Sequence, residues 1–145
     1  MLLGFRRRFA PFVEEGSKTH TIRAKRKRPP RVGETCHCYV DPRQKTMRLL
    51  GRWACVRVED IRITVFRHAY ANIGRVWIEG IELSLDEANA LAWRDGFRGH
   101  GTSEAFAEMV SYWMKLHPEV RRGCQYDFRG DVIHWRYTAA KAAAA

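Results

Sequence analysis

The sequence lacks a long apolar run, and this scarcity excludes a membrane-spanning helix. No segment reaches the roughly 18 to 20 consecutive apolar residues that a transmembrane helix requires. The apolar start over residues 1–5 meets Arg6-Arg7-Arg8 too soon to serve as a signal peptide. We therefore expect a cytoplasmic protein without a membrane partner.

Cysteine is also scarce, and its spacing argues against a metal site. Cys36 and Cys38 lie two residues apart on one face of an expected strand, whereas Cys55 and Cys124 stand alone. No C-x-x-C pair is present, and the six histidines show no metal-ligand or catalytic-triad spacing. We expect reduced, partly buried thiols, no metal and no other cofactor.

Acidic residues are outnumbered, with 16 Asp and Glu against 26 Lys and Arg, for a formal charge of +10. Six of the basic residues follow one another without an intervening acid and form what we call the basic arm. They are Arg23, Lys25, Arg26, Lys27, Arg28 and Arg31. Such a cluster attracts polyanions and makes their binding salt-dependent, so it predicts RNA as a partner. The alternative is a solvated loop that only keeps the protein soluble.

The chain shows no internal repeat and no linker, and its 145 residues match the usual size of one domain. An apolar content of 46% and five tryptophans argue against disorder. We expect a single domain over residues 1–138 and a disordered, alanine-rich tail over 139–145.

Hydrophobic periodicity and turn residues define the expected elements. Gly16 is the natural end of the first helix, and Ser84 with Glu87 has the spacing of a capping box. Thr102 or Ser103 is expected to cap the next helix, and Arg129-Gly130-Asp131 reads as a turn. In chain order we expect a helix over 7–15, strands over 19–23, 34–40, 49–65 and 75–83, helices over 84–94 and from 102 onward, and strands over 125–128 and 132–138. This order predicts a small α+β domain of mostly antiparallel strands around a barrel-like sheet, with two or three short helices packed at one end.

The expected strand over 19–23 has a further consequence for its side chains. Strand alternation places Thr21 and Arg23 on one face and His20 on the opposite face. Lys18 lies three residues before Thr21, so it cannot share that face from a regular strand. A joint site of Lys18 and Thr21 therefore requires a bend after Gly16.

Four sequence elements together match the pattern of a known family. They are Gly16-x-Lys18-Thr19-x-Thr21-Ile22-Arg23, Arg31-x-Gly33-Glu34, Asp95-Gly96-Phe97 and Phe128-x-Gly130-x-x-Ile133-x-Trp135. On these residues the chain resembles the ASCH domain, a member of the PUA-like superfamily. The resemblance implies a PUA-like β-barrel with a cleft between the barrel and the helices that binds RNA or a modified nucleoside.

The resemblance also implies a catalytic set. Some ASCH proteins hydrolyse N4-acylated cytidines with a lysine, a threonine three residues later and a distant carboxylate, which correspond here to Lys18, Thr21 and Asp95. The family pattern has glutamate at the last position, and this chain has the shorter aspartate. A threonine hydroxyl needs an adjacent base, a role open to a neutral Lys18, while Asp95 would protonate the leaving nitrogen.

Ordinary structural roles explain the same residues. Thr21 is a good strand former, Lys18 after a helix end favours the helix dipole, and Asp95-Gly96 is a common way to end a helix.

Two further functions remain open beside the hydrolase. One is a non-catalytic single-stranded RNA-binding module, whose basic arm grips phosphates while Tyr39, Trp53 or Trp77 stacks on bases. The other is a metal-independent ribonuclease that uses Lys18 or an arginine to stabilise charge at phosphorus. The basic arm favours a partner longer than a free nucleoside.

Overall fold

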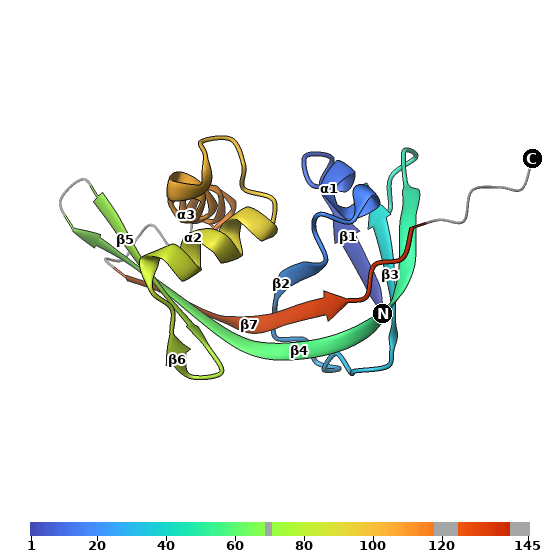
Figure 1. Ribbon diagram of the computed structural model, residues 1–145, viewed down its shortest axis with the longest axis horizontal. Coiled ribbons are helices and arrows are strands. Elements are labelled where there is room, and N and C mark those ends of the chain that lie inside the picture. The colour runs from blue at the N-terminus through green and yellow to red at the C-terminus, as the bar shows by residue number, and fades with distance from the viewer. Residues whose placement is uncertain (69–70, 118–124, 140–145) are drawn as a thin grey trace, which may run out of the picture.

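The computed structural model describes residues 1–68, 71–117 and 125–139 and shows an α+β fold (Figure 1). A long curved sheet forms a bowl, and helices lie on its concave side. The elements are β1 (Leu2–Phe5), α1 (Ala10–Glu15), β2 (His20–Ala24), β3 (Thr35–Val40), β4 (Arg48–His68), β5 (Ala71–Ile78), β6 (Ile81–Glu82), α2 (Leu85–Arg94), a 3₁₀ turn (Thr102–Glu104), α3 (Ala105–Leu116) and β7 (Gln125–Trp135).

Strand β4, with 21 residues, organises the sheet. Its first part pairs with β3, its last part with β5, and β7 pairs with it from Cys55 to Phe66. Strand β2 then pairs with the other edge of β7, and β1 adds to β3 as the parallel strand of this otherwise antiparallel sheet. The predicted α+β class and the mostly antiparallel pairing are therefore confirmed.

The predicted barrel is not confirmed. Closure would require β1 to pair with β2, and no such pairing occurs among the described strands. Side chains bridge this seam instead: Arg23 donates to the carbonyl oxygen of Gly4, and Arg26 donates to that of Leu2 at 3.3 Å. The open seam leaves room for a pocket beside β2.

The first helix begins three residues later than the periodicity suggested, at Ala10. Pro11 in its first turn explains this start, because proline lacks a backbone donor and is tolerated only where no intrahelical bond is needed. Gly16 ends the helix with a φ of 85°, which confirms its predicted role as the left-handed cap. The chain therefore turns sharply just before Lys18.

Two predictions about the strands were wrong. The expected strand over 75–83 is a hairpin of β5 and β6, because Glu79 and Gly80 take φ values of 50° and 77° and close a tight turn. The expected turn over 129–131 lies instead inside the continuous strand β7. Gly130 serves close packing there, since a Cβ at this position would lie 2.2 Å from the carbonyl oxygen of Arg23.

The N-terminus of α3 also differs from the prediction. Neither Thr102 nor Ser103 caps it with a side chain, because both lie in the preceding 3₁₀ turn. The cap comes from α2 instead, where the buried Asn89 side chain accepts a hydrogen bond of 3.0 Å from the Phe106 amide. This bond fixes α3 against α2, whose capping box at Ser84 and Glu87 is confirmed.

Three of the four cysteines lie within the described residues. Cys36, Cys38 and Cys55 are free and buried, and burial raises the pKa of Cys36 and of Cys38 to about 12, so the thiols stay protonated. Cys124 and residues 140–145 of the expected tail lie outside the described residues. In the described parts, no cluster of three or more His, Cys, Asp or Glu suits a metal ion. No helix there combines the length and apolar character needed to cross a bilayer.

Candidate active site

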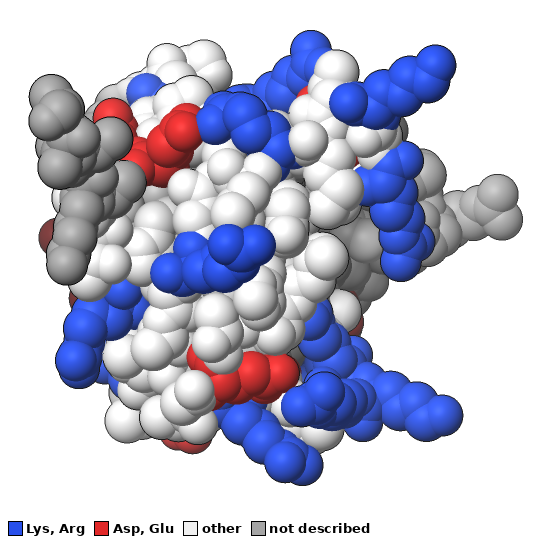
Figure 2. Space-filling view, turned by 90° about the vertical axis from the view of Figure 1, so that its right-hand side faces the viewer, with Lys and Arg blue, Asp and Glu red and all other residues white. Residues whose placement is uncertain are grey.

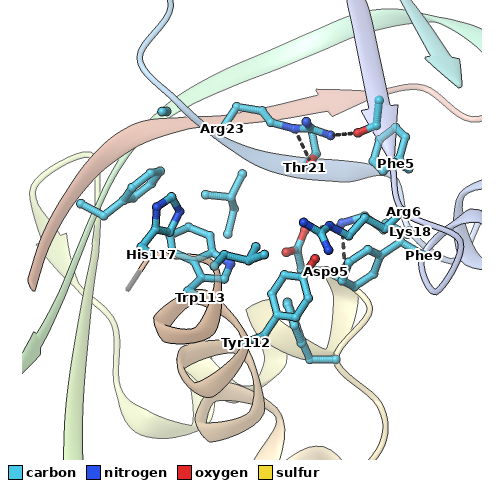
Figure 3. A pocket seen from close by; sticks show the side chains of 16 residues that line it. Phe5, Arg6, Phe9, Lys18, Thr21, Arg23, Asp95, Tyr112, Trp113 and His117 are labelled. Atoms are coloured by element: carbon cyan, nitrogen blue, oxygen red, sulfur yellow. Dashed lines mark hydrogen bonds and ion pairs between the residues drawn. The ribbon is translucent and has the colours of Figure 1, made fainter. Parts of the chain in front are cut away.

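A pocket of about 330 Å³ opens at the seam between β1 and β2 and reaches α3 and the end of α2 (Figure 3). This volume lies at the low end of the range of about 300–1,000 Å³ typical of small-molecule sites. Six of its sixteen lining residues are Phe, Tyr or Trp, and the polar side chains enter from more than one side. The aromatic lining residues are Phe5, Phe9, Phe97, Tyr112, Trp113 and Phe128.

Lys18 enters the pocket from the corner that Gly16 creates. The Lys18 amide donates to the carbonyl oxygen of Phe12 at 2.9 Å, and the carbonyl oxygen of Thr19 accepts from the Trp135 amide at 3.0 Å. These bonds hold the corner on both sides of the lysine. Only 3% of the Lys18 side chain is exposed. The bend that a joint site with Thr21 required is therefore present.

Asp95 reaches the same pocket from the C-terminal end of α2. Its amide donates to the carbonyl oxygen of Leu91 at 2.9 Å, and Gly96 follows with a φ of 108°. Asp95 is thus the residue that ends α2, which is the ordinary structural role considered for it in the sequence analysis. In addition, Lys18 Nζ donates to Asp95 Oδ1 and, at 2.7 Å, to the Asp95 carbonyl oxygen. Two residues that are 77 positions apart form a buried pair.

The environment of this pair disfavours its charges. Burial lowers the pKa of Lys18, assisted by the positive charges of Arg23 and Arg98, and opposed by the attraction of Asp95. Burial also raises the pKa of Asp95 against the attraction of Lys18. Both shifts favour the form in which the proton sits on the carboxyl and the amine is neutral. In that form the pair has one acid and one base.

Thr21 faces the pocket from β2 and is buried. Arg23 Nε donates to Thr21 Oγ1 at 3.1 Å, and its guanidinium also lies 5.2 Å from the centre of the Phe5 ring. Since the hydroxyl oxygen accepts from Arg23, its own proton is directed elsewhere. No hydrogen bond joins Lys18 to Thr21 among the described contacts, so the two approach the pocket from separate sides (Figure 3).

The basic arm is less free than its sequence indicated. Arg23 lies in the pocket wall, Lys25 Nζ contacts carboxylates of Asp131 at 2.6 Å and Asp60 at 2.8 Å, and Arg26 bridges the seam. Arg28 lies 3.5 Å from Glu34. Lys27 and Arg31 are the members with exposed side chains and no ion pair in the described structure. Most of the arm is therefore engaged with other parts of the protein.

Basic side chains outnumber acidic ones on one end of the molecule. Figure 2 shows the end that carries α1, β1 and β3, where Lys and Arg project around a mostly uncharged centre and Asp and Glu are fewer.

His20 lies next to Asp95, although the sequence analysis did not assign it to the site. It is buried, and its Nε2 lies 3.4 Å from Asp95 Oδ1 without a hydrogen bond. Burial lowers its pKa well below the usual value, and the positive charge of Lys18 adds to this effect. It is not part of the pocket wall, which agrees with its predicted orientation away from Thr21. The only signal in the sequence was its place inside the Lys-Thr-x-Thr motif.

The aromatic residues expected to stack on bases lie elsewhere. Trp53 is buried and stacks on Trp135 with ring centres 6.2 Å apart, so its predicted role is wrong. Trp77 lies between the guanidinium groups of Arg62 and Arg75. Tyr39 does not line the pocket. Stacking on a base in this pocket would fall to the rings that line it.

Comparisons with protein-family models, with curated proteins and with solved structures found no match to this chain. The similarity to ASCH domains therefore remains a hypothesis that depends on the motifs quoted above. The fold and the pocket define a strand-rich α+β protein in which an aromatic cavity holds a buried lysine–aspartate pair opposite a threonine.

Proposed function

We propose that this protein is an ASCH-type amidohydrolase with an open PUA-like sheet, and that it acts on N4-acylated cytidine. One observation supports the proposal most: Lys18, Thr21 and Asp95 all face one pocket, although they come from the corner after α1, from β2 and from the end of α2. The substrate would bind as a nucleoside or as an unpaired base of an RNA. Free, protonated thiols suit a reducing compartment, so we place its action in the cytoplasm.

The pocket suits a flat, weakly polar base. Aromatic rings recognise unpaired bases by stacking, and Tyr112 and Trp113 line one side of the cavity. A base enters such a small cavity only when it is not paired in a duplex. The acyl group on N4 would then point toward the side where Lys18 and Asp95 lie.

The first half of the reaction uses all three polar residues. Thr21 Oγ1 forms a bond with the acyl carbonyl carbon while its proton passes to the neutral amine of Lys18. The carbon–nitrogen bond then breaks as the carboxyl of Asp95 gives its proton to N4 of cytidine. Cytidine leaves, and the acyl group remains as an ester on Thr21.

Water completes the second half. A water molecule attacks the ester carbon and gives one proton to the Asp95 carboxylate, and Lys18 returns a proton to the oxygen of Thr21 as the ester bond breaks. The products are cytidine and a carboxylic acid, and each side chain regains its starting proton. Arg23, which donates to Thr21 Oγ1, keeps that oxygen oriented toward the acyl carbon.

The shorter acid does not prevent this arrangement. Asp95 lies at the end of α2, and Lys18 Nζ reaches both its carboxylate and its carbonyl oxygen. The lysine therefore spans the distance that a glutamate side chain would otherwise cover.

RNA binding without catalysis is the second candidate, and the basic end of the molecule favours it (Figure 2). Cleavage of a phosphodiester fits less well. Stabilising charge on phosphorus needs available cations, whereas Lys18 is engaged with Asp95 and Arg23 with Gly4 and Thr21. Among the described lining residues this leaves Arg6 as the strong base whose side chain makes neither a hydrogen bond nor an ion pair.

The proposal is tested with N4-acetylcytidine as substrate and chromatography to follow the release of cytidine. We expect Lys18→Met, Thr21→Ala and Asp95→Asn each to lower kcat/KM by at least about 100-fold, the usual contribution of a group that moves a proton or attacks. Methionine keeps the buried apolar stem of the lysine. Thr19→Ala is the matched control, because Thr19 lies beside the site and outside the pocket wall.

Two results would contradict it. Folded wild-type protein that releases no cytidine from any N4-acylated cytidine or acylated RNA would leave RNA binding as the function. Variants that retain wild-type kcat/KM would show that the three residues only build the pocket.

A further inference from the structure

A line of titratable side chains leads away from the pocket behind Asp95. His20 Nε2 lies 3.4 Å from Asp95 Oδ1 and has no hydrogen-bond partner although it is buried. His20 on β2 pairs directly with His134 on β7, so both side chains lie on the same face of the sheet. Their ring centres are 5.5 Å apart, so the two imidazoles are direct neighbours.

The line ends at a second hollow, which we call the α2 hollow. His134 Nε2 and Glu59 Oε1 are 2.6 Å apart, and both line this hollow between α2 and strands β4 and β7. Its volume is about 320 Å³, and it shares no lining residue with the candidate active site. The side chain of His134 is 17% exposed and that of Glu59 is 22% exposed, so solvent reaches this end.

The charged groups around the two imidazoles come from every element packed against them. They are Lys18 from the corner before β2, Asp95 and Arg94 from the end of α2, and Arg57 and Glu59 from β4. Burial lowers the pKa of His20 and of His134, and the nearby positive charges act in the same direction. Glu59, at the solvent end, favours the charged form of His134.

The carboxylic acid that the proposed reaction produces must dispose of its proton. Carboxylic acids ionise below about pH 5, so hydrolysis of an amide of cytidine near neutral pH yields a carboxylate and one free proton. Asp95 and Lys18 are both almost fully buried, and a bound nucleoside would fill the mouth of the pocket. A second exit would allow the pair to exchange protons with solvent while the pocket is occupied.

We propose that His20 and His134 form a proton path from Asp95 to Glu59 and the α2 hollow. This purpose rests on the proposed hydrolase activity. When the product acid ionises in the occupied pocket, its proton passes to one oxygen of Asp95 while Asp95 gives its own proton to His20 Nε2. His20 releases one from its other nitrogen to His134, and His134 releases one to Glu59 or to water, so Asp95 ends each turnover protonated, as the hydrolysis requires. Each imidazole accepts a proton at one nitrogen as it releases a proton from the other nitrogen, so no net charge accumulates on the buried rings.

The path requires a particular tautomer of His20. The tautomer can be measured by NMR whether or not the protein hydrolyses a substrate. His20 must carry its proton on Nδ1 and leave Nε2 bare toward the protonated carboxyl of Asp95. The nitrogen-15 shifts of both imidazoles, assigned with His20→Gln and His134→Gln, report the tautomer between pH 6 and 8. We expect a bare Nε2. A proton on Nε2 would make His20 a donor that merely holds a charged Asp95, and it would overturn the path.

The kinetic test uses the open end of the path. We expect His134→Ala to lower kcat at least about tenfold, less than the 10²–10⁴-fold effect of a group that acts on the substrate, and to leave KM unchanged. Imidazole in the buffer should restore kcat, because the substitution enlarges a hollow that solvent already reaches. His100→Ala on an exposed loop is the control and should show neither loss nor response to imidazole.

The outcomes separate this path from the hydrolase proposal. An active wild type with unchanged kcat in His134→Ala, or with a loss that imidazole does not restore, would overturn the path and leave the hydrolase intact. If the wild type hydrolyses no acylated cytidine, the hydrolase proposal fails, and the tautomer of His20 alone decides whether Asp95 is connected to the α2 hollow.

Discussion

Removing the amine of Lys18 should destabilise the protein in a manner that depends on pH. The Lys18 and Asp95 side chains are only 3% and 9% exposed, so neither charge is hydrated once its partner is gone. Breaking a buried pair by removing one partner costs about 3–5 kcal/mol, because the other group is left uncompensated. Lys18→Met keeps the stem that packs near Phe9 and should therefore lose about this amount of unfolding free energy at neutral pH.

The sign of the pH dependence follows from the carboxyl that remains. Burial already raises the pKa of Asp95, and without Lys18 the opposing attraction disappears. The folded variant then binds a proton that the unfolded chain releases above about pH 4. Stability therefore falls as pH rises, by up to about 1.4 kcal/mol per pH unit, until the pH passes the raised pKa of Asp95.

Urea unfolding of Lys18→Met from pH 4 to 8, beside the wild type, measures both effects. Adding Asp95→Asn removes the ionisable group, so the double variant should lose the pH slope and exceed the single variant in stability at pH 8. A single variant within 1 kcal/mol of the wild type at every pH would refute the argument. So would a double variant that keeps the slope.

Three further predictions concern the fold, the arm and acid stability. Gly130→Ala forces a Cβ toward the carbonyl oxygen of Arg23 at 2.2 Å and should lower the free energy of unfolding by about 1–3 kcal/mol, measured in urea. Lys27→Gln with Arg31→Gln should weaken binding to single-stranded RNA and reduce the slope of log affinity against log salt by about 1.4, and an unchanged slope would show that they touch no phosphate. His20→Gln should reduce the loss of stability below about pH 6.5, because the folded protein keeps this imidazole neutral while the unfolded chain protonates it; titration of the unfolding midpoint from pH 4 to 7 checks this.

Local signals in the sequence were sufficient where short-range chemistry decides the structure. Gly16 was predicted to end a helix and does so with a φ of 85°. The spacing of Lys18 and Thr21 required a bend, and that glycine supplies it. Ser84 and Glu87 form the expected capping box. In each case the deciding interaction lies within about four residues, which is the range that a helix turn covers.

The predictions failed where distant segments decide. Gly130 between an arginine and an aspartate is typical of a turn, but β2 and β4 pair with this segment from both sides and keep it extended. Lys25 looked free because its partners, Asp60 and Asp131, lie far along the chain. The Asn89 side chain caps α3 from 17 residues away, which no capping pattern describes. Pairing partners of this kind are set by tertiary packing, to which short-range patterns are blind.

The site and the seam of the sheet depend on the same side chain. Arg23 bridges the gap between β2 and β1 through Gly4, and it also donates to Thr21. A closed barrel would pair these strands through their backbones and leave Arg23 no carbonyl to bind at this edge. The open seam thus makes room for the pocket and also holds the Arg23 guanidinium, which orients the Thr21 hydroxyl. The sequence predicted Arg23 to be one of six basic residues that bind RNA. In the structure Arg23 instead connects the edge of the sheet to the hydroxyl of the candidate nucleophile Thr21.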